Sequence, residues 1–150
     1  MDCYMKFYKS NLRKLGHLYE GIAETLSTLK KHGYAIAILS DKCRVYGDIE
    51  IDLTGIATVF DHVQFMEDGL AYKPEPEGLI RIIERFSVLR AQVLFVGDSP
   101  TDIECAQRAG VECAAALWGS VSVQETLGRG PDQIWHSISE MKSALVSGDA

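Results

Sequence analysis

The chain has 150 residues, a length that allows one compact domain with a hydrophobic core and argues against two. Apolar residues make up 47% and charged residues 24% of the sequence, so a disordered or fibrous protein is excluded. The formal net charge of -6 argues against a nucleic-acid-binding protein, which would normally carry a basic face.

No targeting or membrane segment is apparent in the sequence. No apolar run approaches the roughly 20 residues that a membrane span needs, and the start of the chain lacks the apolar core of a secretory signal. The four cysteines (Cys3, Cys43, Cys105 and Cys113) form no CxxC pair and no zinc-ligand spacing. We therefore expect a cytoplasmic protein with reduced thiols, no membrane partner, and Cys105 and Cys113 in the core.

The first half of the chain alternates helical and strand patterns. Apolar residues at helical spacing predict a helix over 22–32, and Gly33 is a suitable C-terminal stop. The continuous apolar run at 34–39 predicts a buried parallel strand. A weaker helical pattern covers 45–58, and a short strand is predicted at 60–65.

The second half repeats the alternation after a proline-containing loop at Pro74 and Pro76. The same signals predict helices at 78–86, 101–109 and 138–146 and strands at 93–96, 111–117 and 131–135. No repeat, low-complexity tract or linker divides the chain, so residues 1–150 are expected to form a single domain. Strands alternating with helices predict an α/β fold with a parallel sheet covered on both faces.

Polar groups suited to phosphate chemistry follow three of the predicted strands, where ligands bind in such a sheet. Ser40 and Asp41 come after the first strand, Lys73 lies in the proline-stiffened loop, and Asp98 and Asp102 flank a helix start. Hydroxyl, amide and ammonium groups bind phosphoryl oxygens, and carboxylates bind Mg²⁺. The sequence therefore predicts phosphate binding by Ser40, Asp41 and Lys73.

Each of these residues also has an ordinary structural explanation. Ser40 alone is a plausible helix N-cap, and Lys73 alone is a plausible solvated surface lysine. Asp98 and Asp102 alone fit a turn residue and an acid favoured by a helix dipole. Their joint placement at strand ends is what favours a site.

Three segments resemble motifs of the haloacid dehalogenase superfamily, specifically its phosphoglycolate-phosphatase-like branch. LYEGIAETLSTLKKHGYAIAILSDK is similar to the helix and strand that carry the family's Ser/Thr motif, YKPEPEGL to its lysine motif, and FVGDSPTDIECAQRAG to its acidic motif. WGS and PDQIWHSISEM resemble its closing segment. The resemblance runs from about residue 17 to the C-terminal end and implies a Rossmann-like three-layer core.

The resemblance also implies a role for each site residue. Ser40 would bind the phosphoryl group, and Lys73 would be the catalytic residue that offsets its charge and orients the nucleophile. Asp98 would bind the Mg²⁺ cofactor, and Asp102 would position the metal site without contacting the ion itself. Asp41 stands where the family often has Asn, and its carboxylate would repel an anion.

The family's nucleophile, an aspartate in a DxDxT motif at the end of its first strand, has no counterpart here. Residues 1–16 contain one acid, Asp2, and no apolar strand before it. The acid-x-acid-x-Thr pattern at 48–54 follows the Ser40 motif and has no buried strand leading into it, so a solvated helix face is the better reading. We expect a truncated core, without the first central strand and the cap domain, that is inactive alone.

The expected loss of a central strand would leave two strand edges unpaired. Direct pairing of the flanking strands, insertion of the aromatic segment 3–8 or pairing with a second subunit would each repair it, and a homodimer is favoured. Two other functions stay open. The chain is either an active Mg²⁺-dependent phosphatase completed by a partner chain or an absent upstream segment, or a module that binds a phosphorylated small molecule or inorganic phosphate.

Overall fold

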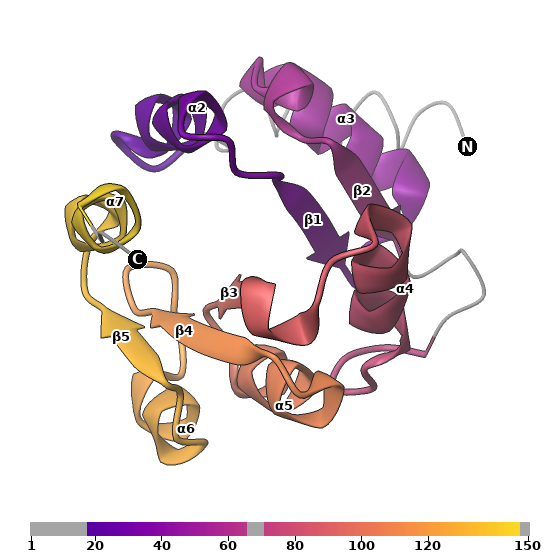
Figure 1. The fold of residues 1–150 in the computed structure, drawn as a ribbon, viewed down its shortest axis with the longest axis vertical. Coiled ribbons are helices and arrows are strands. Elements are labelled where there is room, and N and C mark those ends of the chain that lie inside the picture. Colours follow the sequence, from indigo (N-terminus) through magenta and orange to yellow (C-terminus); the bar gives the residue numbers. More distant parts are fainter. Residues whose placement is uncertain (1–17, 66–70, 148–150) are drawn as a thin grey trace, which may run out of the picture.

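The computed structural model describes residues 18–65 and 71–147, which form the alternating helices and strands seen in Figure 1. Within these ranges the strands are β1 (Ala37–Ser40), β2 (His62–Phe65), β3 (Leu94–Gly97), β4 (Glu112–Ala116) and β5 (Gln133–Trp135). The α-helices are α2 (Ile22–Lys31), α3 (Arg44–Thr54), α4 (Glu77–Phe86), α5 (Pro100–Ala109), α6 (Val123–Gly128) and α7 (Ile138–Val146). Short 3-10 helices cover Ala57–Val59 and Arg90–Gln92.

The predicted strands and helices are all present, with shifted boundaries. β1 begins at Ala37, three residues later than predicted, because the Tyr34 backbone N–H donates to the Leu29 carbonyl at the end of α2 at 3.1 Å. The helix predicted over 45–58 ends at Thr54, since Gly55 adopts a φ of 72° that stops it. Helix α6 and both 3-10 helices were not predicted, because each is too short to show a helical period.

All described strand pairs are parallel, which confirms the predicted α/β class. β1 pairs with β2, with Ala37 opposite His62. β3, β4 and β5 form a second set in that order, with Leu94 opposite Glu112. α4 and α5 pack on one face of these strands, whereas α2 and α7 lie side by side on the other (Figure 1). The result is the expected three-layer arrangement.

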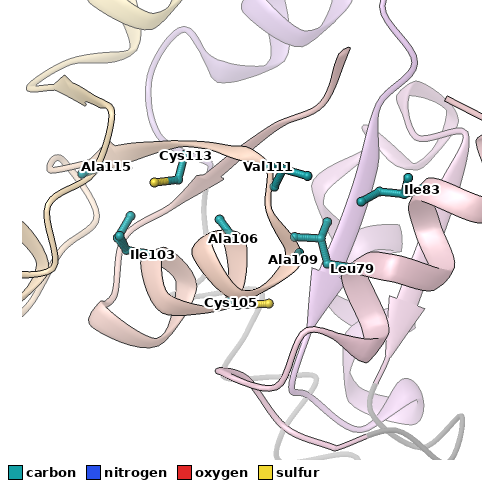
Figure 2. Close-up of a cluster of buried hydrophobic side chains, with 9 residues drawn as sticks. All are labelled: Leu79, Ile83, Ile103, Cys105, Ala106, Ala109, Val111, Cys113 and Ala115. Carbon is teal, nitrogen blue, oxygen red and sulfur yellow. The ribbon is translucent and has the colours of Figure 1, made fainter. Parts of the chain in front are cut away.

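A core of small and branched side chains fixes α5 against the sheet. Figure 2 shows this cluster, with residues from α4, α5, β4 and the turn before β4 pointing toward one another. Its members are Leu79, Ile83, Ile103, Cys105, Ala106, Ala109, Val111, Cys113 and Ala115. Cys105 and Cys113 are fully buried free thiols, as predicted, and burial raises the pKa of Cys105 to about 11. Both are therefore packing residues at neutral pH.

β1 and β3 are edge strands of the two sets and do not pair with each other. A cavity of about 770 Å³ lies between them, lined by residues 37–39 of β1 and residues 94–97 of β3. Direct pairing of these strands, one of the repairs considered from the sequence, is therefore wrong. The segment 3–8 lies outside the described residues, so its insertion stays a prediction, as does the homodimer.

Every helix in the described part of the chain falls short of the length and apolar character that a membrane span needs.

Candidate functional site

Lys73 is held between two acidic residues at the carboxyl ends of β1 and β3. Its backbone N–H donates to Asp41 Oδ1 at 3.1 Å, and its ammonium Nζ donates to Asp102 Oδ1 at 2.7 Å. Asp41 Oδ2 lies 3.9 Å from the same Nζ. The Lys73 side chain is only 14% exposed. The solvated surface lysine considered from the sequence is therefore wrong, and three of the predicted site residues are in contact.

Asp102 is held in place by the first turn of α5. Ser99 caps the helix: its Oγ donates to Asp102 Oδ2 at 2.6 Å and accepts from the Asp102 N–H at 3.3 Å. The backbone N–H groups of Asp98 and Ser99 donate to the same carboxylate oxygen at 3.2 and 3.1 Å. Pro100 occupies the first helical position of α5, and Gly110 ends the helix with a φ of 70°.

The two acids of this motif have opposite pKa shifts. Burial works to raise the pKa of Asp102, but the Lys73 ammonium and the Ser99 hydrogen bonds outweigh burial and hold the pKa below its ordinary value. Burial and then the Asp102 carboxylate raise the pKa of Asp98. Asp98 is exposed as a whole residue yet lines the cavity between β1 and β3. Asp102 is thus a fixed anion, whereas the ionised form of Asp98 lowers the stability of the folded protein.

Ser40 ends β1 and is not a helix N-cap, because α3 begins after Cys43. Its Oγ accepts from the Lys42 N–H at 3.2 Å. Ser40, Asp41 and Lys73 line one small pocket. The structure therefore brings the three predicted phosphate-binding residues to the same place.

The acidic pattern at 48–54 lies on α3, as expected for a solvated helix face. Asp48 and Asp52 are exposed, and Glu50 forms an ion pair with Lys42. None of the three lines the cavity between β1 and β3.

Sequence reasoning missed two residues that support the Asp98 loop. A Cβ added at Gly119 would lie 2.9 Å from Asp98 Oδ2, so only glycine fits there without displacing the carboxylate. Thr126, fully buried on α6, donates its hydroxyl to the Asp98 carbonyl at 3.4 Å. Gly119 lies in the WGS segment, which the sequence analysis noted without giving it a role, and nothing in the sequence pointed to Thr126.

The residues present fit Mg²⁺ as part of a site. Within residues 18–65 and 71–147, no group of three His, Cys, Asp or Glu side chains could hold a metal ion. Mg²⁺ commonly uses one or two protein carboxylates together with substrate phosphates and water. Asp98 meets that smaller requirement, whereas Asp102 is already occupied by Lys73 and Ser99. Further ligands from phosphate, water or another segment are needed for tight binding.

Replacing Asp98 with Asn should stabilise the metal-free protein, because it removes a carboxylate whose ionised form is disfavoured in the folded state. We expect the Tm at pH 7 to rise by about 1–3 °C. Because its pKa is raised, the ionised Asp98 carboxylate lowers the free energy of unfolding above that pKa, and this loss disappears as the pH falls through the pKa. The stability gained by Asp98→Asn should therefore be smaller at pH 4 than at pH 7. Thermal unfolding measured at both pH values checks this. Asp48→Asn on α3 is the matched control with no expected change, and a lower Tm for Asp98→Asn would contradict the account.

Comparisons with known proteins identify the family of this chain. The family model described as haloacid dehalogenase-like hydrolase matches residues 1–116. A pyrophosphatase PpaX from Bacillus velezensis is 31% identical over 141 residues, covering 94% of this chain and 65% of its own length. A phosphoglycolate phosphatase from Haemophilus influenzae is 30% identical over 142 residues, with 93% and 62% covered.

A solved structure gives the same result for the fold. The crystal structure of a predicted phosphoglycolate phosphatase from Haemophilus somnus superposes with a TM-score of 0.84 at 27% identity. The match covers 92% of this chain and 61% of that one, so this chain spans less than two thirds of the length of these relatives. The chain belongs to the family of haloacid dehalogenase-like hydrolases.

Proposed function

We propose that this chain forms the phosphate- and metal-handling part of a phosphatase centre and does not hydrolyse phosphate esters alone. The observation that carries the proposal is the Lys73 ammonium, held 2.7 Å from Asp102 where β1 and β3 end. A nearly buried cation fixed at that edge is placed to meet a phosphoryl group.

Each site residue has a distinct part in this proposal. Ser40 offers its hydroxyl to a phosphoryl oxygen, and Lys73 offsets the phosphoryl charge. Asp98 holds Mg²⁺, which when bound supplies charge neutralisation at the phosphate. Asp102 acts through Lys73 and the Asp98 loop, because its two carboxylate oxygens are occupied by their donors.

The proposed inactivity follows from the chemistry of the acids at the site. The family's reaction uses a free aspartate nucleophile, and loss of a covalent route costs many orders of magnitude in rate. Among the described residues, Asp41 and Asp102 both contact Lys73, and Asp98 is the residue that fits the metal. Residues 1–17 contain a single acid, Asp2, outside any DxDxT sequence.

Substrate class is proposed from charge and from the relatives. Relatives named for pyrophosphate and phosphoglycolate support a small phosphorylated molecule or inorganic phosphate as the ligand. Three carboxylates, those of Asp41, Asp98 and Asp102, surround the one ammonium of Lys73 in the described site. A phosphate dianion alone would meet net negative charge there, so we expect it to bind only together with Mg²⁺.

A thermal-shift series checks this requirement. Phosphate plus Mg²⁺ should raise the Tm of the protein, whereas phosphate alone or Mg²⁺ with chloride should raise it little. Lys73→Met should abolish the combined effect, and Lys31→Met, on the surface helix α2, is the matched control that should retain it. An unchanged Tm with both ligands present would argue against phosphate handling.

A second candidate function is an active phosphatase whose nucleophile comes from a partner chain or from an upstream segment. The cavity between β1 and β3 favours this alternative, since it opens beside Lys73 and Asp98. Addition of such a segment should restore Mg²⁺-dependent turnover, and its failure to do so would leave the chain as a binding module.

A further inference from the structure

Asp41 keeps one carboxylate oxygen without a hydrogen-bond donor beside the Lys73 ammonium. Its Oδ1 accepts the Lys73 backbone N–H at 3.1 Å, which fixes the carboxylate against the lysine loop. Its Oδ2 lies 3.9 Å from Lys73 Nζ, too far for a hydrogen bond, and no group within residues 18–65 and 71–147 donates a hydrogen bond to it. The Asp41 side chain is 37% exposed, so a ligand can reach the carboxylate.

The other carboxylates of the described site already have partners or a different part to play. Both oxygens of Asp102 accept hydrogen bonds. Glu75 lines the same small pocket as Asp41 but forms an ion pair with Arg108 at 2.6 Å. Asp98 is the residue that the proposed function assigns to Mg²⁺. Asp41 Oδ2 is therefore the carboxylate oxygen of the described site that is left to contact the organic part of a ligand.

The position of Asp41 places its carboxylate next to any phosphoryl group that the site holds. Ser40, directly before it in the chain, and Lys73 line one small pocket with it. A phosphoryl group held by the Lys73 ammonium and the Ser40 hydroxyl therefore has the Asp41 carboxylate beside it. A carboxylate in that position repels a second negative charge on the ligand and attracts a positive one. Such a group gives specificity both by rejecting anionic competitors and by holding the preferred ligand.

We propose that Asp41 is a specificity-determining residue that selects phosphate monoesters with an ammonium group, the aminoalkyl phosphates, over esters whose organic part is neutral or anionic. The inference rests on the proposed function, since it names the ligand class of the same phosphate site. The phosphoryl group contacts Lys73 and Ser40 together with Mg²⁺, and the ligand ammonium donates to Asp41 Oδ2. This recognition requires no bond to be made or broken, so it is a property of the isolated chain.

Three phosphate esters of matched size test this inference on the 150-residue chain. 2-Aminoethyl phosphate and propyl phosphate have the same shape and end in an ammonium or a methyl group, whereas phosphoglycolate ends in a carboxylate. Titration calorimetry at one saturating Mg²⁺ concentration measures each Kd, with inorganic phosphate as the reference. We expect 2-aminoethyl phosphate to bind about tenfold more tightly than propyl phosphate, and phosphoglycolate to bind more weakly than both.

Asp41→Asn separates charge recognition from a folding defect. Asn keeps an oxygen for the Lys73 N–H and replaces the second carboxylate oxygen with an NH₂ group. It should weaken 2-aminoethyl phosphate and tighten phosphoglycolate, each by about fivefold or more, whereas a misfolded site would weaken all three esters. Asp48→Asn on α3 removes the same charge from an exposed position and is the matched control that should leave each Kd unchanged. The comparison of esters on the parent needs no variant, so it decides even if Asp41→Asn does not fold.

The outcomes distinguish this inference from the proposed function. Binding of inorganic phosphate together with equal affinities for the three esters would overturn the inference and leave the proposed function intact. Tightest binding of phosphoglycolate by the parent would also overturn it, as would a preference for the ammonium ester that persists in Asp41→Asn. Failure of inorganic phosphate and of all three esters to bind with Mg²⁺ would contradict the proposed function, and this inference with it.

Discussion

Replacing Asp102 with Ala should lower the free energy of unfolding by about 3–5 kcal/mol, because it leaves the ammonium of Lys73 buried without its closest partner. The same change removes the acceptor for the Ser99 hydroxyl and for two backbone N–H groups at the start of α5. Chemical denaturation with a single transition measures the loss.

A double-mutant cycle separates the ion pair from the helix cap. Lys73→Ala should lower the free energy of unfolding by less than Asp102→Ala does, since Asp102 keeps three donors from Asp98 and Ser99 when the ammonium is gone. The double variant should therefore have a free energy of unfolding close to that of Asp102→Ala, or higher. Glu104→Ala, which removes surface ion pairs on the same helix, should cost about 0–1 kcal/mol. Equal costs for Asp102→Ala and Glu104→Ala would contradict the described packing of Lys73.

Acid should remove the stabilisation that the Asp102 carboxylate provides. The pKa of Asp102 lies below its ordinary value, so its contribution is present above the unfolded-state pKa and is lost as the pH falls through the folded-state pKa. The parent protein should therefore lose stability below about pH 4 more steeply than Asp102→Asn does. Unfolding free energies measured between neutral pH and pH 3 check the slope, and parallel profiles would contradict it.

Replacing Gly97 with Ala should lower the free energy of unfolding by about 3 kcal/mol, because there is no room for a methyl group at the end of β3. An added Cβ would lie 2.1 Å from Asp102 Cβ and 2.6 Å from its Cγ. The clash forces α5 away from β3 and separates Asp102 from Lys73. The Mg²⁺-dependent phosphate response should be lost together with the stability.

Gly128→Ala on α6 is the matched control for that substitution. Nothing lies within 4 Å of a Cβ added at Gly128, so stability should change by less than about 1 kcal/mol. Equal effects of the two substitutions would show that β3 and α5 are not in the close contact described here. Together the two variants test the geometry on which the site depends.

The sequence was most informative where local signals were complete. The helix predicted at 101–109 agrees within one residue with α5, and every described strand overlaps a predicted one. β1 begins later than the predicted strand because the Tyr34 N–H bonds back to the Leu29 carbonyl of α2. The apolar pattern at 34–39 does not show where that helix cap ends.

In the candidate site, too, the sequence predicts the residues with local signals but not the contacts that depend on the three-dimensional fold. Ser40, Lys73, Asp98 and Asp102 are predicted as site residues because each belongs to a recognisable motif next to a strand end. The Lys73–Asp102 ion pair, 29 residues apart in sequence, depends on how the loop before α4 and the first turn of α5 are placed in space. Support from Gly119 and Thr126 depends on the packing of α6 and its preceding turn, which the sequence pattern did not reveal.

The proposed inactivity is checked by measuring hydrolysis of an aryl phosphate in the presence of Mg²⁺ by the purified 150-residue chain, at a measured oligomeric state. We expect a rate equal to that of the protein-free reaction, because the proposed site holds phosphate and metal without a nucleophile. Mg²⁺-dependent turnover that disappears in both Asp98→Ala and Lys73→Ala would contradict it.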